Sequence, residues 1–220
     1  MEAWRATLAE MKAVYEADPV AAVRSQRFIK HVHEEIEREL TARLTTEAVN
    51  DGVHVCLEAP VHGSFKDKNV DVAVLHPVNG PLISVGVRSQ MSSIAKNILT
   101  YLQDIMGEAV SLQDRFPMTV YGYIYLLPIR PHDSKAEIDF SRYARLFSNV
   151  AERGATTYKN ERGKYDHFAF ALVDFAQEPP ALLEDRVAQA SPDADLRVSN
   201  FTDRLIRTFE RRNPWLTYFT

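Results

Sequence analysis

The chain has 220 residues, a hydrophobic share of 45% and a net charge of −4, values typical of one globular domain. The negative charge gives no general attraction to nucleic acid, so any such binding must come from a local basic surface. The single cysteine, Cys56, excludes an internal disulfide and a multi-cysteine zinc site. No run approaches the ~18 apolar residues of a membrane span, and the amino terminus lacks the apolar core of a signal peptide. We therefore expect one cytoplasmic domain over residues 1–220.

The first part of the chain is typical of two helices followed by a strand. Apolar residues at helical spacing predict a helix over residues 2–16 and a longer one from 20 to about 46, separated by Asp18-Pro19. From residue 53 to 58 apolar and polar residues alternate, which predicts the first strand.

Two further strands surround a turn and bring one carboxylate and one guanidinium together. Alternating valines predict strands over 70–74 and 83–87. The period of two puts Asp71 on the face opposite its neighbouring valines, and it puts Gly86 and Arg88 on one side of their strand. We therefore expect Asp71 and Arg88 on a common face. A charged pair on an apolar sheet is costly to bury, so it is either well partnered or functional.

The second half continues with alternating helices and strands. A helix is expected over 92–115, with Ser92 or Ser93 as its N-cap, and a central strand over 118–127. Then follow a helix near 140–153, a polar loop over 156–165 and a strand over 168–175. The loosest segment is 177–195. Asn200 and Asp203 resemble a capping box that opens the last helix.

This order of helix, three strands, helix and strand, with Asp71 in the second strand and a charged residue ending the third, resembles the PD-(D/E)XK nuclease superfamily. That superfamily includes many restriction endonucleases. The segments VRSQMSSIAKN and GEAVSLQDRFPMTVYGYIYLLP look like bacterial proteins related to restriction enzymes. The resemblance covers roughly residues 20–128. It implies an α/β fold with a restriction-endonuclease-like core, extra helices at both ends and a C-terminal extension over 129–220.

The resemblance also implies a metal site. Asp71 matches the metal-binding aspartate of the family, Gly86 stands where the family has a second carboxylate, and Arg88 stands where it has lysine. In the family the carboxylates hold a divalent metal, usually Mg²⁺ (or Mn²⁺), which polarises the scissile phosphate. Glycine contributes no ligand. Arginine can clamp a phosphate, but it stays protonated and cannot act as a base.

Other residues are candidates for the missing groups. Glu58 is expected on the polar side of the first strand, beside Asp71, as a second metal ligand. Glu35 and Glu39 could supply a helical carboxylate, and Lys96 could replace the lost lysine. Two plainer interpretations stay open: Asp71 could be a structural partner of Arg88, and Glu58 a solvated strand residue.

Contacts to nucleic acid are expected at two places. The first lies around the start of the helix after Arg88, and the second is the polar loop with its interleaved tyrosines. The candidate residues are Gln90, Ser92, Ser93, Asn97, Lys159, Arg162 and Lys164. The plainer alternatives are helix caps, a loop-closing glutamine and a solvated basic face. His31 and His33 diverge on their helix, so no zinc site is expected.

The leading hypothesis is a DNA-binding nuclease of a restriction or defence type that hydrolyses phosphodiester bonds with a divalent metal. Many enzymes of this kind dimerise, so a homodimer is a further expectation. The rival is a catalytically inactive relative that binds DNA or serves as a protein-interaction subunit. An aromatic tail formed by Trp215, Tyr218 and Phe219 would then be its contact surface.

Overall fold

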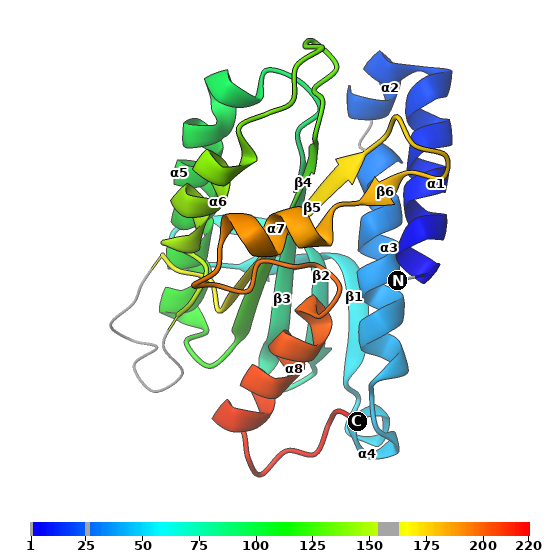
Figure 1. Ribbon diagram of the computed structural model, residues 1–220. Coiled ribbons are helices and arrows are strands. Elements are labelled where there is room, and N and C mark those ends of the chain that lie inside the picture. The colour runs from blue at the N-terminus through cyan, green and yellow to red at the C-terminus, as the bar shows by residue number, and fades with distance from the viewer. Residues whose placement is uncertain (1, 25–26, 154–162) are drawn as a thin grey trace.

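A computed structural model describes residues 2–24, 27–153 and 163–220 and has an α/β fold, in which one six-stranded sheet lies between two layers of helices (Figure 1). The described elements follow the chain in this order: α1 (Glu2–Ala17), α2 (Pro19–Arg24), α3 (Arg27–Ala42), α4 (Thr46–Asn50), β1 (His54–His62), β2 (Asp67–His76), β3 (Gly80–Ser89), α5 (Ile94–Arg115), β4 (Val120–Pro128), α6 (Phe140–Ser148), β5 (His167–Asp174), β6 (Ala181–Leu182), α7 (Glu184–Ala190) and α8 (Phe201–Arg212). No helix within these ranges is long and apolar enough to cross a membrane.

The six strands lie in the sheet in the same order as in the chain. β1, β2 and β3 form an antiparallel meander, β4 and β5 continue parallel to β3, and β6 is antiparallel to β5. α5 is the crossover that parallel pairing of β3 and β4 requires. The predicted α/β class, and the order of helix, three strands, helix and strand, are therefore confirmed.

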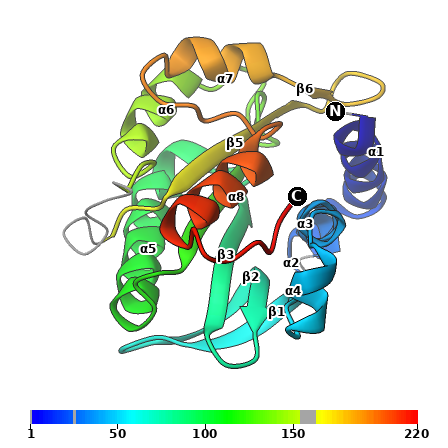
Figure 2. The same cartoon turned by 90° about the horizontal axis from the view of Figure 1, so that it is seen from below.

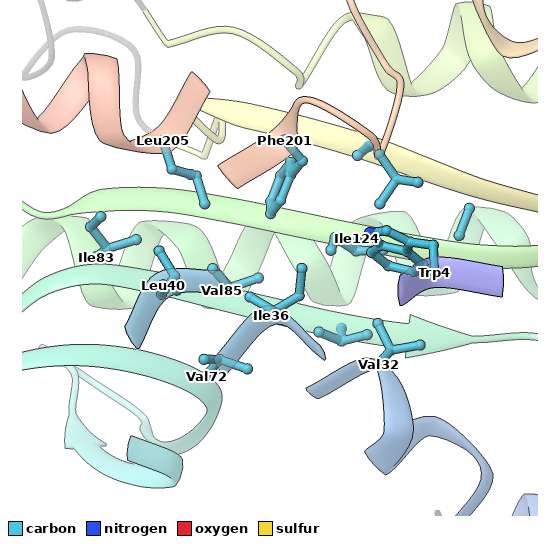
Figure 3. Close-up of a cluster of buried hydrophobic side chains, with 14 of the residues drawn as sticks. Trp4, Val32, Ile36, Leu40, Val72, Ile83, Val85, Ile124, Phe201 and Leu205 are labelled. Carbon is cyan, nitrogen blue, oxygen red and sulfur yellow. The ribbon is translucent and has the colours of Figure 1, made fainter. Parts of the chain in front are cut away.

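Two apolar cores lie on the two faces of the sheet (Figure 2). The α3 core packs α1, α3 and α8 against one face, and Figure 3 shows Trp4, Ile36, Val85 and Leu205 meeting there. The α5 core packs α5, α6 and α7 against the other face and is rich in aromatic side chains. Because both faces are covered, β4 is buried along its whole length.

Several predicted boundaries were wrong. Where one helix is expected from 20 to 46, the structure describes α2 and α3, and α3 ends at Ala42, before Leu44, which forms a bridge with Phe219. α6 ends at Ser148, and the loose segment 177–195 contains β6 and α7. The capping box of α8 is not formed, since the Asn200 side chain instead bonds to Arg204 and an upstream aspartate.

Candidate functional site

Asp71 lies where the first two strands bend. In the ladder between β1 and β2, Leu57 pairs with Val72 and Ala59 pairs with Val70, so Glu58 lies opposite Asp71. Glu58 has a φ of 51°, a left-handed conformation that non-glycine residues rarely adopt. As a result Leu57 packs against the α3 core and Ala59 packs in the α5 core, although alternate residues of a regular strand share a face. Strained residues of this kind gather at functional sites.

A cavity of about 350 Å³ opens beside Asp71. We call it the Asp71 cavity. Helices α2 and α3 supply Ala22, Phe28, Ile29 and His33, and the strands β2, β3 and β4 and helix α5 supply the other lining residues. Its polar lining residues are His33, Lys68, Asp71, Arg88, Ser89, Tyr101, Glu108 and Tyr123. The cavity therefore combines acidic, basic and imidazole groups, which is typical of a site that binds a charged ligand.

Three metal-ligand side chains meet here. One ligand atom from each of His33, Glu58 and Asp71 lies within 4.8 Å of the others. Within the cluster, His33 Nδ1 lies 3.3 Å from Glu58 Oε1. Two ligand atoms that each lie about 2.1 Å from one ion are roughly 3 to 4 Å apart, so a small inward movement of the three side chains would let them coordinate one cation.

One nitrogen of the buried His33 imidazole has no hydrogen bond within the described part of the chain, while the other, Nδ1, faces Glu58. Its side chain is 3% exposed, and Nε2 has no partner among the described residues. Buried polar atoms are nearly always hydrogen-bonded, so this ring is suited to a ligand that the protein itself does not supply.

Asp71 uses one of its two carboxylate oxygens within the protein. Oδ2 accepts a hydrogen bond of 2.6 Å from the backbone N–H of Val87. Burial raises the pKa of Asp71 above its usual value, and the Val87 N–H and His33 act in the opposite direction. Because a bound cation favours the ionised carboxylate, it would offset the cost of burial.

Two positively charged side chains, Arg88 and Lys68, line the cavity beside this cluster. The Arg88 guanidinium lies 3.9 Å from the centre of the Tyr101 ring and 4.0 Å from Asp104 Oδ2. Lys68 forms an ion pair with Glu108 of α5. Arg88 therefore shares the cavity with Asp71, as the strand pattern predicts, but its ion pair is with Asp104, so the direct Asp71–Arg88 pair is not formed.

Gly86 of β3 pairs with Tyr123 of β4, and its neighbour Val85 pairs with Val72 of β2, the residue after Asp71. A Cβ atom at Gly86 would lie 2.6 Å from both Cδ2 and Cε2 of Tyr123. The tyrosine ring thus fills the space that a side chain at position 86 would need. The position that the resemblance assigns to a second carboxylate is closed by an aromatic ring.

Lys96 and Ser93 lie outside the Asp71 cavity. They line a separate hollow at the start of α5, where Asp133 Oδ2 accepts hydrogen bonds from the Ser93 backbone N–H (2.9 Å) and hydroxyl (3.3 Å). Ser93 is at the N-cap position but makes no side-chain cap bond. Lys68 rather than Lys96 is the lysine that lines the cavity.

Gln90 is buried rather than available to a base. Its amide nitrogen donates to the carbonyls of Ser92 (3.3 Å) and Ser93 (3.1 Å), and its amide oxygen accepts from the Tyr125 hydroxyl. These bonds close the turn between β3 and α5. Gln90 therefore corresponds to the plainer alternative of a loop-closing residue.

Three other predicted contacts, Ser92, Asn97 and Lys164, do not line the Asp71 cavity. Ser92 is exposed and Asn97 is half-buried near the start of α5, and Lys164 is half-buried after α6. Lys159 and Arg162 lie outside the described residues.

The helical carboxylates Glu35 and Glu39 face other helices. Glu35 accepts a hydrogen bond of 3.3 Å from Thr7, and Glu39 accepts one of 3.2 Å from the Trp4 indole and another from Thr202. These bonds hold α1 and α8 against α3, so neither side chain joins the cluster at Asp71.

The sequence prediction sets His33 aside because it diverges from His31, and in the structure it is His33 that faces Asp71. The sequence does contain a pattern that indicates a partner for His33 in the sheet. His33 falls on the buried stripe of α3 between Ile29 and Ile36, where a polar residue needs a partner from the sheet.

The ligand atoms of the cluster suit a divalent cation, and their types favour some metals over others. It offers one imidazole nitrogen and two carboxylates, one on a half-exposed and one on a mostly buried side chain. Mg²⁺ prefers ligands that are all oxygen, whereas Mn²⁺ and Zn²⁺ accept imidazole readily.

Comparison of the chain with protein-family models, curated proteins and solved structures finds no match.

Proposed function

We propose that the protein is a metal-dependent nuclease with a restriction-endonuclease-like core, and that its substrate is DNA. The observation that carries this proposal is the cluster of His33, Glu58 and Asp71 beside a cavity that also holds Arg88. The order of helix, three-stranded meander, helix and parallel strand supports the core assignment.

The cluster and the two cationic residues of the cavity have separate roles in this proposal. Asp71, Glu58 and His33 hold the cation, which when bound polarises the scissile phosphate and lowers the pKa of an attacking water. Arg88 is oriented by the face of Tyr101 and neutralises phosphate charge. Lys68 adds a second cation, which its pairing with Glu108 keeps beside the site.

Cleavage of plasmid and of labelled oligonucleotides tests the proposal. With Mn²⁺ the wild type should cleave DNA, and Asp71→Asn should lose about 100-fold or more in rate because the cation is lost. Asp67→Asn is the matched control, since Asp67 lies on the same strand, its side chain is 74% exposed, and within the described residues its ion pair is with the exposed His62. Failure of the wild type to cleave single- and double-stranded DNA with either Mn²⁺ or Mg²⁺ would contradict the proposal.

A second candidate function is a catalytically inactive relative that binds DNA. The observation that favours it is the Tyr123 ring over Gly86, which leaves no room for a second carboxylate there. This candidate predicts salt-sensitive DNA binding without cleavage. Calorimetric titration with Mn²⁺ separates the two, because metal binding that requires Asp71 is expected only of the nuclease.

A role based on a free aromatic tail is not supported by the burial of its residues. Tyr218 is 3% and Phe219 7% exposed, and Phe219 bridges to Leu44. Only Trp215, at 70%, is exposed among the three aromatic residues of that segment. Removal of the segment should therefore damage the α3 core rather than only an interaction surface.

A further inference from the structure

Three tyrosines alternate along β4 and face the α5 core: Tyr121, Tyr123 and Tyr125. The Tyr121 hydroxyl donates a hydrogen bond of 3.1 Å to the Phe116 carbonyl, and the Tyr125 hydroxyl donates to Gln90. The Tyr123 hydroxyl has no hydrogen-bond partner within the described residues, although the residue is only 3% exposed. The middle residue of the row is therefore the exception, and because its oxygen is not among the fully buried, unpartnered polar atoms of the described residues, the hydroxyl is open to an outside partner.

The exception lies in the Asp71 cavity. Tyr123 is one of its lining residues, whereas Tyr121 and Tyr125 are not. The charged groups that act most strongly on its hydroxyl are Arg88, Glu108 and Asp71. Burial raises the pKa of Tyr123 well above its usual value, so the hydroxyl is protonated at neutral pH and available as a donor.

The ring of Tyr123 is held firmly. It stacks on Phe168 with centroids 5.6 Å apart, and it meets the edge of Tyr165 at 5.3 Å. On its open side lies Gly86, which is not among the glycines with a positive φ. Glycine is therefore needed at position 86 for space and not for backbone conformation, and the space it leaves is taken by this ring.

We propose that Tyr123 contacts the substrate, and that its hydroxyl donates a hydrogen bond to a phosphate oxygen of the DNA bound in the Asp71 cavity. This inference rests on the proposed function. Two observations carry it: the Tyr123 hydroxyl makes no hydrogen bond within the described residues and is not sealed from solvent, and Arg88 and Lys68 line the same cavity, where an anion would be stabilised. Gly86 and Tyr123 then act as one unit, in which the glycine admits the ring that carries the donor.

Tyr123→Phe tests this inference, because it removes the hydroxyl and keeps the ring over Gly86. We expect kcat/KM for an oligonucleotide duplex with Mn²⁺ to fall about 10- to 100-fold, as for loss of a donor that acts on developing charge. The Kd for Mn²⁺ alone, measured by calorimetry, should stay within about twofold, and Tm should not fall, since no hydrogen bond within the described protein is lost.

Tyr125→Phe is the matched control on the same face of the same strand. Its hydroxyl is bonded to Gln90, so this variant should lower Tm and keep kcat/KM within about twofold. If the wild type binds the duplex without cleaving it, the Kd from fluorescence anisotropy replaces kcat/KM, and the same contrast is expected.

The outcomes separate the two proposals. Equal activity or affinity of wild type and Tyr123→Phe, with a functional wild type, overturns the role of Tyr123 and leaves the nuclease assignment intact. A parallel fall of Tm and kcat/KM also overturns it, because the hydroxyl would then be structural. A wild type that neither cleaves nor binds the duplex rejects the proposed function, and the role of Tyr123 with it.

Discussion

Two aspartates of the sheet region have opposite surroundings. Asp166, just before β5, is 2% exposed and accepts two hydrogen bonds from each of the guanidinium groups of Arg153 and Arg212, and one from the Tyr121 N–H. Asp71 accepts one, from Val87, and no guanidinium pairs with it within the described residues. Burial of a charge therefore does not by itself mark a functional site. What distinguishes Asp71 is unused hydrogen-bonding capacity at a cavity.

The largest expected effect is a loss of stability on substitution of Asp166, the aspartate bonded to two guanidinium groups. Asp166→Asn leaves the Arg153 and Arg212 guanidiniums buried without a counter-charge, which costs about 3–5 kcal/mol of unfolding free energy. For a chain of this size Tm should fall by about 10 °C, measured by thermal unfolding followed by circular dichroism. The Mn²⁺ affinity of the folded protein should not change. A loss below about 1 kcal/mol would show that this network is not essential to the fold.

Substitution of Asp71 should instead weaken metal binding and leave stability nearly unchanged. Asp71→Asn keeps an acceptor for the Val87 N–H and removes a carboxylate whose pKa is raised by burial, so Tm should stay level or rise by about 2 °C. The Kd for Mn²⁺ from isothermal calorimetry should rise about 100-fold, while Asp67→Asn should leave it unchanged. Mn²⁺ binding that survives Asp71→Asn would remove Asp71 from the metal site.

A smaller effect concerns the choice of metal. His33→Gln replaces the imidazole with an amide, so the affinity for Mn²⁺ should fall about 10- to 100-fold and that for Mg²⁺ by less than about threefold. Competition calorimetry with both metals measures the ratio. If both affinities fall equally, the imidazole does not set the metal preference.

The smallest effect is the pH dependence. A protonated carboxyl does not bind a cation, and the pKa of Asp71 is raised, so Mn²⁺ affinity should weaken on acidification at a pH above the usual aspartate range. In the metal-free protein the raised pKa means that ionised Asp71 opposes folding. This penalty is present above the folded-state pKa and disappears as the pH falls below it. Calorimetry and Tm between pH 7.5 and 4.5 check both signs, and Asp71→Asn should remove the contribution of Asp71 from the Tm profile.

The sequence predicted the sheet well because its strands alternate strongly. The valines around Asp71 and Gly86 predict two strands, and the period of two predicts that Arg88 shares the cavity with Asp71. Alternation also predicted Glu58 beside Asp71, as the ladder shows. Counting along the ladder places these residues side by side, although the alternation itself fails there: Leu57 and Ala59 pack in different cores, and so do Val70 and Val72 on either side of Asp71.

Features that depend on distant elements could not be predicted. His33 joins Asp71 only because α3 packs over β2, and Tyr123 lies over Gly86 only because β4 pairs with β3 in one particular register. Lys96 follows Arg88 closely in sequence, yet the turn closed by Gln90 directs the start of α5 toward another hollow. No local pattern specifies these contacts.

The left-handed residue Glu58 links the two halves of the interior. Because the chain changes sides there, residues on either flank of Glu58 are anchored in separate apolar clusters, one above and one below the sheet. A ligand that immobilises this carboxylate would brace both layers at once. Slower amide exchange should then spread from β1 into α3 and α5 together, far beyond the few atoms that touch the ligand.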